Sequence, residues 1–453
     1  MKRLMLPVCM SLSLLTGCGA TEDPAESLIK WKIEGRFDPR HITDQGTTYN
    51  LDSPDQENFR IRKVSAQGSV EWTKSYSLIN GYAERGVPTV TLQQGADGRQ
   101  RLVLVSSGYN YATDTTPGNT DFHILVLDEQ GVITNEILTV GETFPDGYYH
   151  YSVDTEIPGL IIRFKDHSLE LVSEGGVIPV EMPATLDRYL IDNVRYTDDA
   201  VMVLLRSESR GSFDNKVAYV SLEGKVLWTQ DIESVSSSFN DSMFYSRVAG
   251  NGVCEYRLQP FDATGFLTPK VIPCSEQEAG SYAFTEPRDG KLHFSNEYEG
   301  LTYVRRDIES GEIEAQYENL IDTSGAYVSS INGYPTYLIN DIGQVVLPYL
   351  VTTDHGGVDQ VLNAGLHVSY RSGVVVLNAD MSMFAEIEFP EYHVYTWLLR
   401  CYSWCADNGD ERSGYQITGA KVVDGEIYVT LRYMDYDHIS GTAVYRYYLA
   451  ALN

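Results

Sequence analysis

The 453-residue sequence predicts an all-β fold assembled from repeated sheets. Three observations predict it. A unit of two strands joined by a turn recurs along the chain, and the strands alternate apolar and polar residues, which is the period of a half-buried strand. The turns recur at a spacing that suits a sheet of four strands. Long stretches with helical periodicity and capping residues are absent.

Six copies of the unit carry a glycine in the turn, where positive φ is required. These glycines are 63, 45, 48, 41 and 46 residues apart, and a period of about 40–50 residues is typical of the four-stranded blades of a β-propeller. A seventh, degenerate copy begins at Ser372 and has Met381 in place of the glycine. The regular copies begin at Phe59, Phe122, Ser168, Val217, Cys254 and Thr302, and their glycines are Gly68, Gly131, Gly176, Gly224, Gly265 and Gly311.

The two ends of the chain complement one another. The last segment contains three predicted strands, Gln416–Val422, Glu426–Tyr433 and Thr442–Leu452, and lacks an outer fourth strand. The first predicted strand, Leu28–Glu34, resembles the missing one. An N-terminal strand that completes the last blade removes two exposed sheet edges. Seven internal hairpins and this composite blade predict a single propeller of eight four-stranded blades, or of seven if the weak third or seventh copy is not a blade.

The N-terminus predicts export. Lys2 and Arg3 precede an apolar stretch, Leu4–Leu15, that is too short to span a membrane, for which about 20 apolar residues are needed. The stretch ends in Leu-Thr-Gly followed by Cys18, a pattern that resembles the lipobox of bacterial lipoproteins, whose cysteine thiol takes a diacylglycerol. The alternative is an ordinary secretory signal with an incidental cysteine. We expect residues 1–17 to be a signal peptide and Cys18 to be the lipid-bearing first residue of the mature protein.

The resemblance to lipoproteins also implies a destination. Residue 19 is Gly19, not the aspartate that retains such proteins in the inner membrane. The resemblance therefore implies an anchor of fatty acyl chains, such as palmitate, in the outer membrane of a Gram-negative bacterium. Residues 18–27 are small, polar and include a proline, which is typical of a tether. The propeller domain then occupies residues 28–453.

The charge of the chain narrows the class of partner. The sequence has 34 Lys and Arg against 63 Asp and Glu, a formal net charge of −29. Removal of Lys2 and Arg3 with the signal peptide leaves 32 − 63 = −31. Such a surface repels phosphate backbones, which argues against nucleic acid as a partner. The same field attracts cationic partners or calcium, unless the carboxylates form only a solvated exterior.

Four cysteines remain besides Cys18 and the one in the signal peptide. An even number in an exported chain predicts disulfides. Cys254 and Cys274 are equally distant from the middle of a predicted hairpin and so can join its open ends, while Cys401 and Cys405 can close a tight loop. A zinc half-site at the last pair is the alternative, but no second pair of ligands at zinc spacing completes it.

Two copies of the unit, those from Phe59 and Val217, each end in Gly-x-Val-x-Trp-Thr. In this they resemble the repeats of quinoprotein-like and WD40-like β-propellers, which include lipoproteins of Gram-negative outer membranes. The resemblance covers nearly all of the mature chain and implies the propeller fold. The sequence lacks the regularly repeated tryptophan docking motif and the vicinal cysteines of quinoprotein enzymes, so we expect no quinone cofactor.

Motifs that carry catalytic chemistry are missing from the sequence. There is no GxSxG nucleophile elbow, no HExxH helix and no phosphate-binding loop. The nine histidines are scattered, and none pairs at metal-ligand spacing. We therefore expect no catalytic residue and no resident metal or other cofactor. Acidic segments at Asp52–Glu57, Asp407–Glu411 and Asp435–Asp437 leave calcium open as an alternative.

Tyrosine is unusually frequent, with 32 residues against 14 Phe. Tyrosine is a good strand residue and can line the faces of the blades. Exposed Tyr and Trp also suit binding, because they offer a large contact area at low entropic cost. Tyr402 and Trp404, inside the Cys401–Cys405 loop, are the candidate binding residues.

Two functions from different classes fit the sequence. The first is a non-catalytic, membrane-tethered platform that binds a protein of the cell envelope. The second is a propeller that binds or hydrolyses glycans with acidic and aromatic loop residues, since a pair of carboxylates can serve glycoside hydrolysis. The missing catalytic motifs favour the platform.

Overall fold

The fold was analysed in a computed structural model of the chain. It describes residues 25–453 apart from 39–40, 53–57, 78–83, 86–88, 95–99, 111–117, 145–149, 153–159, 174–175, 198–199, 208–214, 233–237, 241–242, 251–252, 276–282, 297–300, 319, 321–326, 330–337, 341, 358–365, 397–412 and 438–441.

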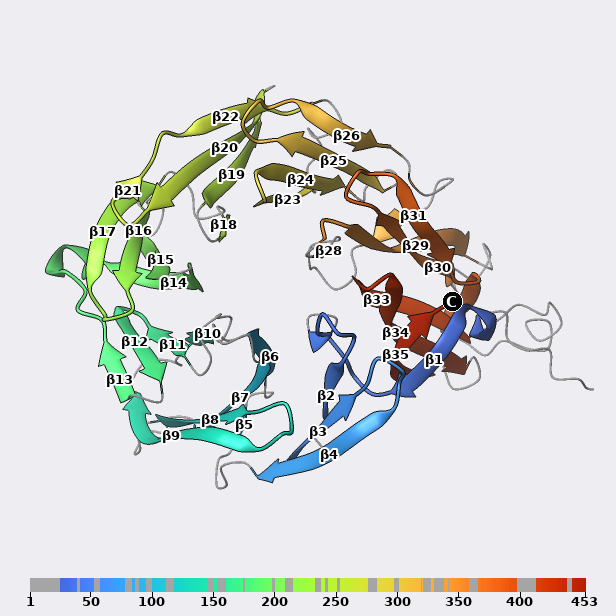
Figure 1. Cartoon of the computed structure of the whole chain (residues 1–453), viewed down its shortest axis with the longest axis horizontal. Helices are drawn as coiled ribbons and strands as arrows, with labels where there is room; N and C mark the ends of the chain where they lie inside the picture. The colour runs from blue at the N-terminus through green and yellow to red at the C-terminus, as the bar shows by residue number, and fades with distance from the viewer. Residues whose placement is uncertain are drawn as a thin grey trace, which may run out of the picture.

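The described strands group into eight antiparallel sheets that stand around a common centre, as Figure 1 shows. Within the described ranges the only helical segments are two short 3-10 helices, η1 (Glu26–Leu28) and η3 (Ala184–Leu186). No described helix is long and apolar enough to cross a membrane. The prediction of an all-β propeller is therefore confirmed. The number of four-stranded blades stays a prediction, because three to six strands are described per sheet.

Seven of the sheets are each built from consecutive strands, which follow the ring in chain order. The first three sheets contain β2 (Thr48–Asp52), β3 (Asn58–Val64) and β4 (Val70–Ser77); then β5 (Glu84–Arg85), β6 (Thr89–Gln94), β7 (Gln100–Asn110), β8 (Gly118–Leu127) and β9 (Ile133–Phe144); then β10 (His150–Ser152), β11 (Ile161–Lys165), β12 (Ser168–Ser173) and β13 (Gly176–Pro179).

The next four sheets continue the ring in the same way. They contain β14 (Tyr189–Tyr196), β15 (Ala200–Ser207), β16 (Asn215–Ser221) and β17 (Val226–Ile232); then β18 (Ser238–Asn240), β19 (Met243–Gly250), β20 (Val253–Asp262), β21 (Gly265–Phe266) and β22 (Lys270–Pro273); then β23 (Ala283–Arg288), β24 (Lys291–Asn296), β25 (Thr302–Asp307) and β26 (Ile313–Tyr317); then β27 (Tyr327–Ser329), β28 (Leu338–Ile339), β29 (Val345–Gly357), β30 (Leu366–Leu377), β31 (Met383–Glu388) and β32 (Tyr392–Thr396).

The eighth sheet closes the ring with both ends of the chain. Its strands are β33 (Ser413–Val423), β34 (Glu426–Asp437), β35 (Thr442–Leu452) and, as the outer strand, β1 (Ile29–Glu34). β1 is antiparallel to β35, with Ile33 opposite Leu449. The composite sheet predicted from the two chain ends is confirmed, and we call it the closing sheet.

The predicted turn glycines have positive φ, as a tight hairpin turn requires. Position 68 also requires a residue without a side chain, because a Cβ there would lie 2.5 Å from the ring of Trp31 in β1. Met381, in the degenerate copy, adopts φ 68° although it is not a glycine. The weak copies at Ser168 and Ser372 both form paired strands, β12 with β13 and β30 with β31.

The core lies between neighbouring sheets. Between the β10–β13 and β14–β17 sheets, for example, Leu171, Val203 and Leu205 are fully buried. Tyrosine contributes to this core. Ten tyrosines among the described residues are buried, namely Tyr49, Tyr76, Tyr189, Tyr219, Tyr256, Tyr303, Tyr349, Tyr392, Tyr415 and Tyr428.

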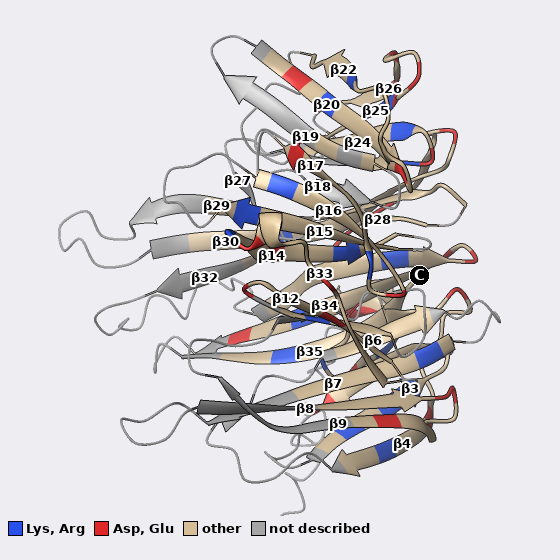
Figure 2. Ribbon diagram, turned by 90° about the vertical axis from the view of Figure 1, so that its left-hand side faces the viewer, with Lys and Arg blue, Asp and Glu red and all other residues tan. Residues whose placement is uncertain are grey.

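The strand order gives the ring two different faces. We call the side with the predicted hairpin turns, those at Gly68, Gly131, Gly224 and Gly311, the turn face, and the opposite side the loop face. The tight turns gather along the right-hand edge of Figure 2, where the C-terminus also lies. The C-terminal end of β32 and the N-terminal end of β33 both lie on the side of their sheets opposite to the hairpin turns. β32 therefore ends, and β33 begins, at the loop face.

Candidate interaction surface

The Cys254–Cys274 disulfide is present, as the spacing predicted. The two Cα atoms are 5.3 Å apart, and the Cys274 amide donates a hydrogen bond to the Cys254 carbonyl at 3.0 Å. Cys254 lies near the start of β20, and Cys274 follows the end of β22. The bond therefore joins the open ends of the hairpin at the loop face, opposite the Gly265 turn.

The other predicted site residues lie outside the described residues. They are the lipidation site Cys18, the second cysteine pair, Cys401 and Cys405, and the candidate binding residues Tyr402 and Trp404. The strand ends that flank the last four, Thr396 of β32 and Ser413 of β33, are at the loop face.

Little of the predicted acidic segments falls within the described part of the chain. Asp52 is there, and its carboxylate is paired with Arg60. Residues 53–57 and 407–411 lie outside, and Asp435 is exposed on β34. No group of three or more His, Cys, Asp or Glu side chains positioned to hold a metal ion occurs among the described residues.

Exposed carboxylates recur around the turn face, and Figure 2 shows them in red at the turns. Seven of the eight sheets contribute at least one to a described turn. The eighth, β10–β13, has its predicted turn residues 174–175 outside the described residues. The exposed acids are Asp44, Glu129, Glu223, Asp262, Asp289, Glu309, Glu312, Asp380 and Asp424.

Some of these acids also stabilise the turn in which they lie. Asp262 Oδ1 accepts hydrogen bonds from the hydroxyl and amide of Thr264 at 2.6 and 2.7 Å, and these bonds hold the pKa of Asp262 below its ordinary value. The hydroxyl of Ser382, followed by its amide, lowers the pKa of Asp380 in the same way. Hydrogen bonds to the charged form of a carboxylate favour ionisation, so the turn face stays negative at neutral pH.

Tryptophans connect three pairs of sheets just beneath the turn face. Trp31 packs on the Gly68 turn of the next sheet. The Trp72 indole donates a hydrogen bond to the Glu129 carbonyl at 3.1 Å, and the Trp228 indole donates one to the Asp262 carbonyl at 3.0 Å. The indoles of Trp72 and Trp228 therefore each satisfy their single donor on a turn of the neighbouring sheet.

The contact around Trp228 includes three further aromatic rings. Its ring stacks on Tyr219 with centroids 5.3 Å apart and meets Phe266 edge-on at 5.4 Å. Phe261 completes the group, 6.0 Å from Tyr219. We call this set of four rings, between the β14–β17 and β18–β22 sheets, the aromatic seam.

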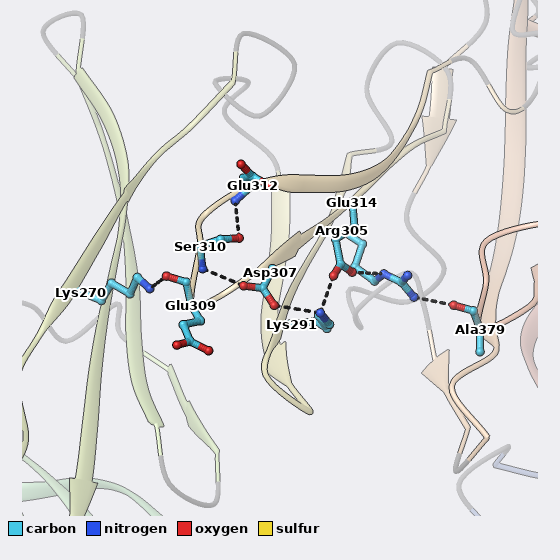
Figure 3. Close-up of polar contacts among 9 residues, drawn as sticks. All are labelled: Lys270, Lys291, Arg305, Asp307, Glu309, Ser310, Glu312, Glu314 and Ala379. Carbon is cyan, nitrogen blue, oxygen red and sulfur yellow. Dashed lines mark hydrogen bonds and ion pairs between the residues drawn. The ribbon is translucent and has the colours of Figure 1, made fainter.

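A second contact between sheets is built from charges. In Figure 3, Lys291 of β24 lies between two carboxylates, with Asp307 Oδ2 at 2.9 Å and Glu314 also in contact. Arg305 of β25 pairs with Glu314 at 3.0 Å and donates from Nη1 to the Ala379 carbonyl at 2.7 Å. Because Ala379 belongs to the turn between β30 and β31, the network connects two sheets. We call these five residues the polar seam.

The charges of the polar seam stabilise one another. The backbone amide of Ser310 donates to Asp307 at 2.7 Å and, together with Lys291, holds the pKa of Asp307 well below its ordinary value. Hydrogen bonds to Glu314 and then to Asp307 raise the pKa of Lys291. Asp307 and Lys291 therefore remain charged over the physiological range.

His293 lies on the same sheet and is buried against a tyrosine. Its ring nitrogen is 2.6 Å from the hydroxyl of Tyr303, and both residues are buried. Burial, followed by the nearby guanidinium of Arg305, lowers the pKa of His293 to about 3. A ring that stays neutral above that pH has a packing role here.

The sequence contained a signal for the tryptophan contacts but not for the charged ones. The tryptophans of both Gly-x-Val-x-Trp-Thr repeats, Trp72 and Trp228, make the same hydrogen bond to the next sheet, although a regular docking motif is absent from the sequence. Lys291 and Glu314 are brought together by strand pairing, and their sequence spacing carries no comparable sign.

No protein-family model and no curated protein matches this chain. The chain is similar to solved structures that include β-propeller proteins. The WD40 domain of SCAP from fission yeast is 10% identical, with a TM-score of 0.37 over 93% of this chain and 91% of that one. BamB from Moraxella catarrhalis is 12% identical, with a TM-score of 0.35 over 92% and 98%. The dihydro-heme d1 dehydrogenase NirN is 12% identical, with a TM-score of 0.39 over 96% and 81%.

Proposed function

We propose that this protein is a non-catalytic interaction platform of the bacterial cell envelope. It is anchored in the outer membrane through lipid on Cys18 and binds an envelope protein through its loop face. The contact includes Tyr402 and Trp404, in the loop closed by a Cys401–Cys405 disulfide.

The disulfide between Cys254 and Cys274 supports export. Disulfides persist in oxidising compartments such as the periplasm and are rare in the cytosol. The bond agrees with the signal peptide expected over residues 1–17, and both features support a location outside the cytoplasm.

The choice of the loop face as the binding face rests on the position of two strand ends. Thr396 and Ser413, which flank the segment with Tyr402 and Trp404, lie at the loop face, where the Cys254–Cys274 bond also lies. The sheets beneath them are held together by buried seams, so the ring offers a stable support for loops. Binding residues are commonly found on loops that a rigid scaffold positions.

In-cell crosslinking of the tagged lipoprotein, followed by mass spectrometry, tests this proposal. We expect reproducible capture of one envelope protein and its loss in a Tyr402→Ala/Trp404→Ala variant. The matched control is Glu223→Ala on the turn face, which should leave capture unchanged. A Cys18→Ala form should fold but fail to complement a deletion strain.

Two results would contradict the platform. One is full complementation by Cys18→Ala, which would remove the anchored role. The other is capture of only abundant neighbours together with retention of the purified domain on a glycan array, which would favour the glycan-binding alternative.

A further inference from the structure

The chain enters the ring at the turn face. β35 is the third strand of the closing sheet and β1 is the fourth. The end of β35 and the start of β1 therefore lie where the other sheets have the hairpin turn between their third and fourth strands. The Asn453 amide donates to the Leu28 carbonyl at 3.0 Å, and its side chain donates to the Ser27 carbonyl at 2.8 Å. The C-terminal Asn453 is thus bonded at this face to the segment that leads into β1.

The entry point is held firmly against the ring. Ala25 is only 4% exposed and packs in the apolar cluster between the closing sheet and the β27–β32 sheet. Glu26 accepts a hydrogen bond from the Tyr415 hydroxyl at 2.6 Å and also pairs with Lys32 of β1. The part of the tether that precedes the ring therefore ends at residue 25.

The length of that part limits how far the ring can move from its anchor. Cys18 and Ala25 are seven positions apart in the sequence. A fully extended chain spans at most about 3.3–3.6 Å per residue, so the reach is about 25 Å. β35 extends eleven residues from the loop face to the turn face, which is about 35 Å at the usual rise of a strand. The tether is therefore shorter than the ring is thick.

We propose that the turn face beside the closing sheet is the side of the protein that faces the bilayer. This inference rests on the proposed lipidation of Cys18. The loop face is then directed away from the membrane, where a partner can reach it without competition from lipid.

The charge of the turn face opposes direct adsorption of that face to the bilayer. Its carboxylates repel anionic headgroups, so the face itself does not adsorb, and the acyl chains alone hold the ring to the bilayer. A surface of this kind stays close to the membrane without being buried in it.

Fluorescence quenching on vesicles tests the orientation. A fluorescent amino acid is placed at Gln67, an exposed residue in the Gly68 turn of the turn face, or at Val444, 53% exposed near the loop-face end of the closing sheet. The lipidated protein is bound to vesicles of phosphatidylethanolamine and phosphatidylglycerol that carry a nitroxide on a fraction of the headgroups. We expect at least threefold stronger quenching at position 67 than at position 444.

Equal quenching at the two positions, or stronger quenching at position 444, would overturn the proposed orientation. Vesicle flotation separates this failure from failure of the anchor. If the wild-type protein floats and Cys18→Ala does not, the anchor holds and the quenching decides the orientation. If the wild-type protein does not float, the anchor is refuted and the orientation with it.

Discussion

The aromatic seam and the polar seam both connect neighbouring sheets, the first through apolar rings and the second through charged groups. Each joins two neighbouring sheets close to the turn face. The aromatic seam does so with four rings and one indole hydrogen bond to the Asp262 carbonyl. The polar seam does so with Arg305 and its bond to the Ala379 carbonyl, while Glu314 and Lys291 hold the arginine in place.

The difference shows how each seam should respond to its surroundings. Burial of rings depends on area removed from water and is insensitive to salt and pH. Arg305 and Glu314 are 18% and 29% exposed, so their attraction is partly screened and depends on the protonation of nearby groups. Mutations that are matched across the two seams can therefore separate apolar from electrostatic stabilisation within one ring.

The largest effect is expected in the aromatic seam. Trp228→Ala removes the stack on Tyr219, the contact with Phe266 and the bond to the Asp262 carbonyl. We expect a loss of about 3–4 kcal/mol in the free energy of unfolding, as is typical of a large aromatic residue that leaves a cavity. Urea unfolding monitored by circular dichroism measures it. Trp228→Phe is the control and should lose about 1 kcal/mol. Equal losses in the two variants would argue against the stacking.

The disulfide lies in a sheet between the two seams. Its removal should cause the second-largest loss in the free energy of unfolding. Cys254 and Cys274 are 20 residues apart, so loop closure predicts a cost of about 3 kcal/mol for Cys254→Ala/Cys274→Ala. Reductant should shift the urea midpoint of the wild-type protein by a similar amount and leave the variant unchanged. A wild-type midpoint that does not respond to reductant would contradict the bond.

A smaller effect is expected when the polar seam is cut. Arg305→Met leaves the Ala379 carbonyl without this donor and Glu314 with Lys291 alone. The expected loss is about 2 kcal/mol, which is typical of a hydrogen bond to a charged group. Arg371→Met, which breaks a looser pair with Glu388 at 3.5 Å, is the matched control and should cost under about 1 kcal/mol. The contact between sheets would be unimportant if both variants lost the same amount.

The fourth prediction is that the stability contributed by the polar seam depends on pH, whereas that of the aromatic seam does not. The pKa of Asp307 is lower in the folded than in the unfolded protein, so its contribution to stability is complete above the unfolded value, about 3.9, and is lost as the pH falls through the folded value. The stability difference between wild type and Asp307→Asn should therefore shrink as the pH falls below about 4. For Trp228→Phe the difference should not change with pH. Urea titrations from pH 7 to pH 3 compare the two variants.

Local patterns were sufficient to predict the hairpins and the closure of the ring. Gly68 and its counterparts mark turns with positive φ, and even Met381 was identified from its place in the repeat. Thr442–Leu452 forms β35 as predicted, and β1 pairs with it because no other strand completes that sheet. These features depend on alternation and on edge pairing, which a single sequence displays.

The contacts between sheets could not be predicted in the same way. Arg305 and Ala379 are 74 residues apart, and only the angle between two packed sheets brings them together. The acidic turn face was visible only as a net charge, because the sequence does not show that Glu223 and Asp380 lie on one side of a ring. The predicted binding residues Tyr402 and Trp404 lie outside the described residues and stay a prediction.

The pairing of β1 with β35 has a mechanical consequence. If the lipid anchor is pulled while the ring is held by a partner, the force enters at Ala25, at the turn-face end of β1. A bilayer on that side directs the load along the strand, so its hydrogen bonds to β35 are sheared together and are not peeled one by one. The strand that closes the ring would then also be the one that bears tension, and the resistance of the anchored protein to force would depend on the direction of the pull.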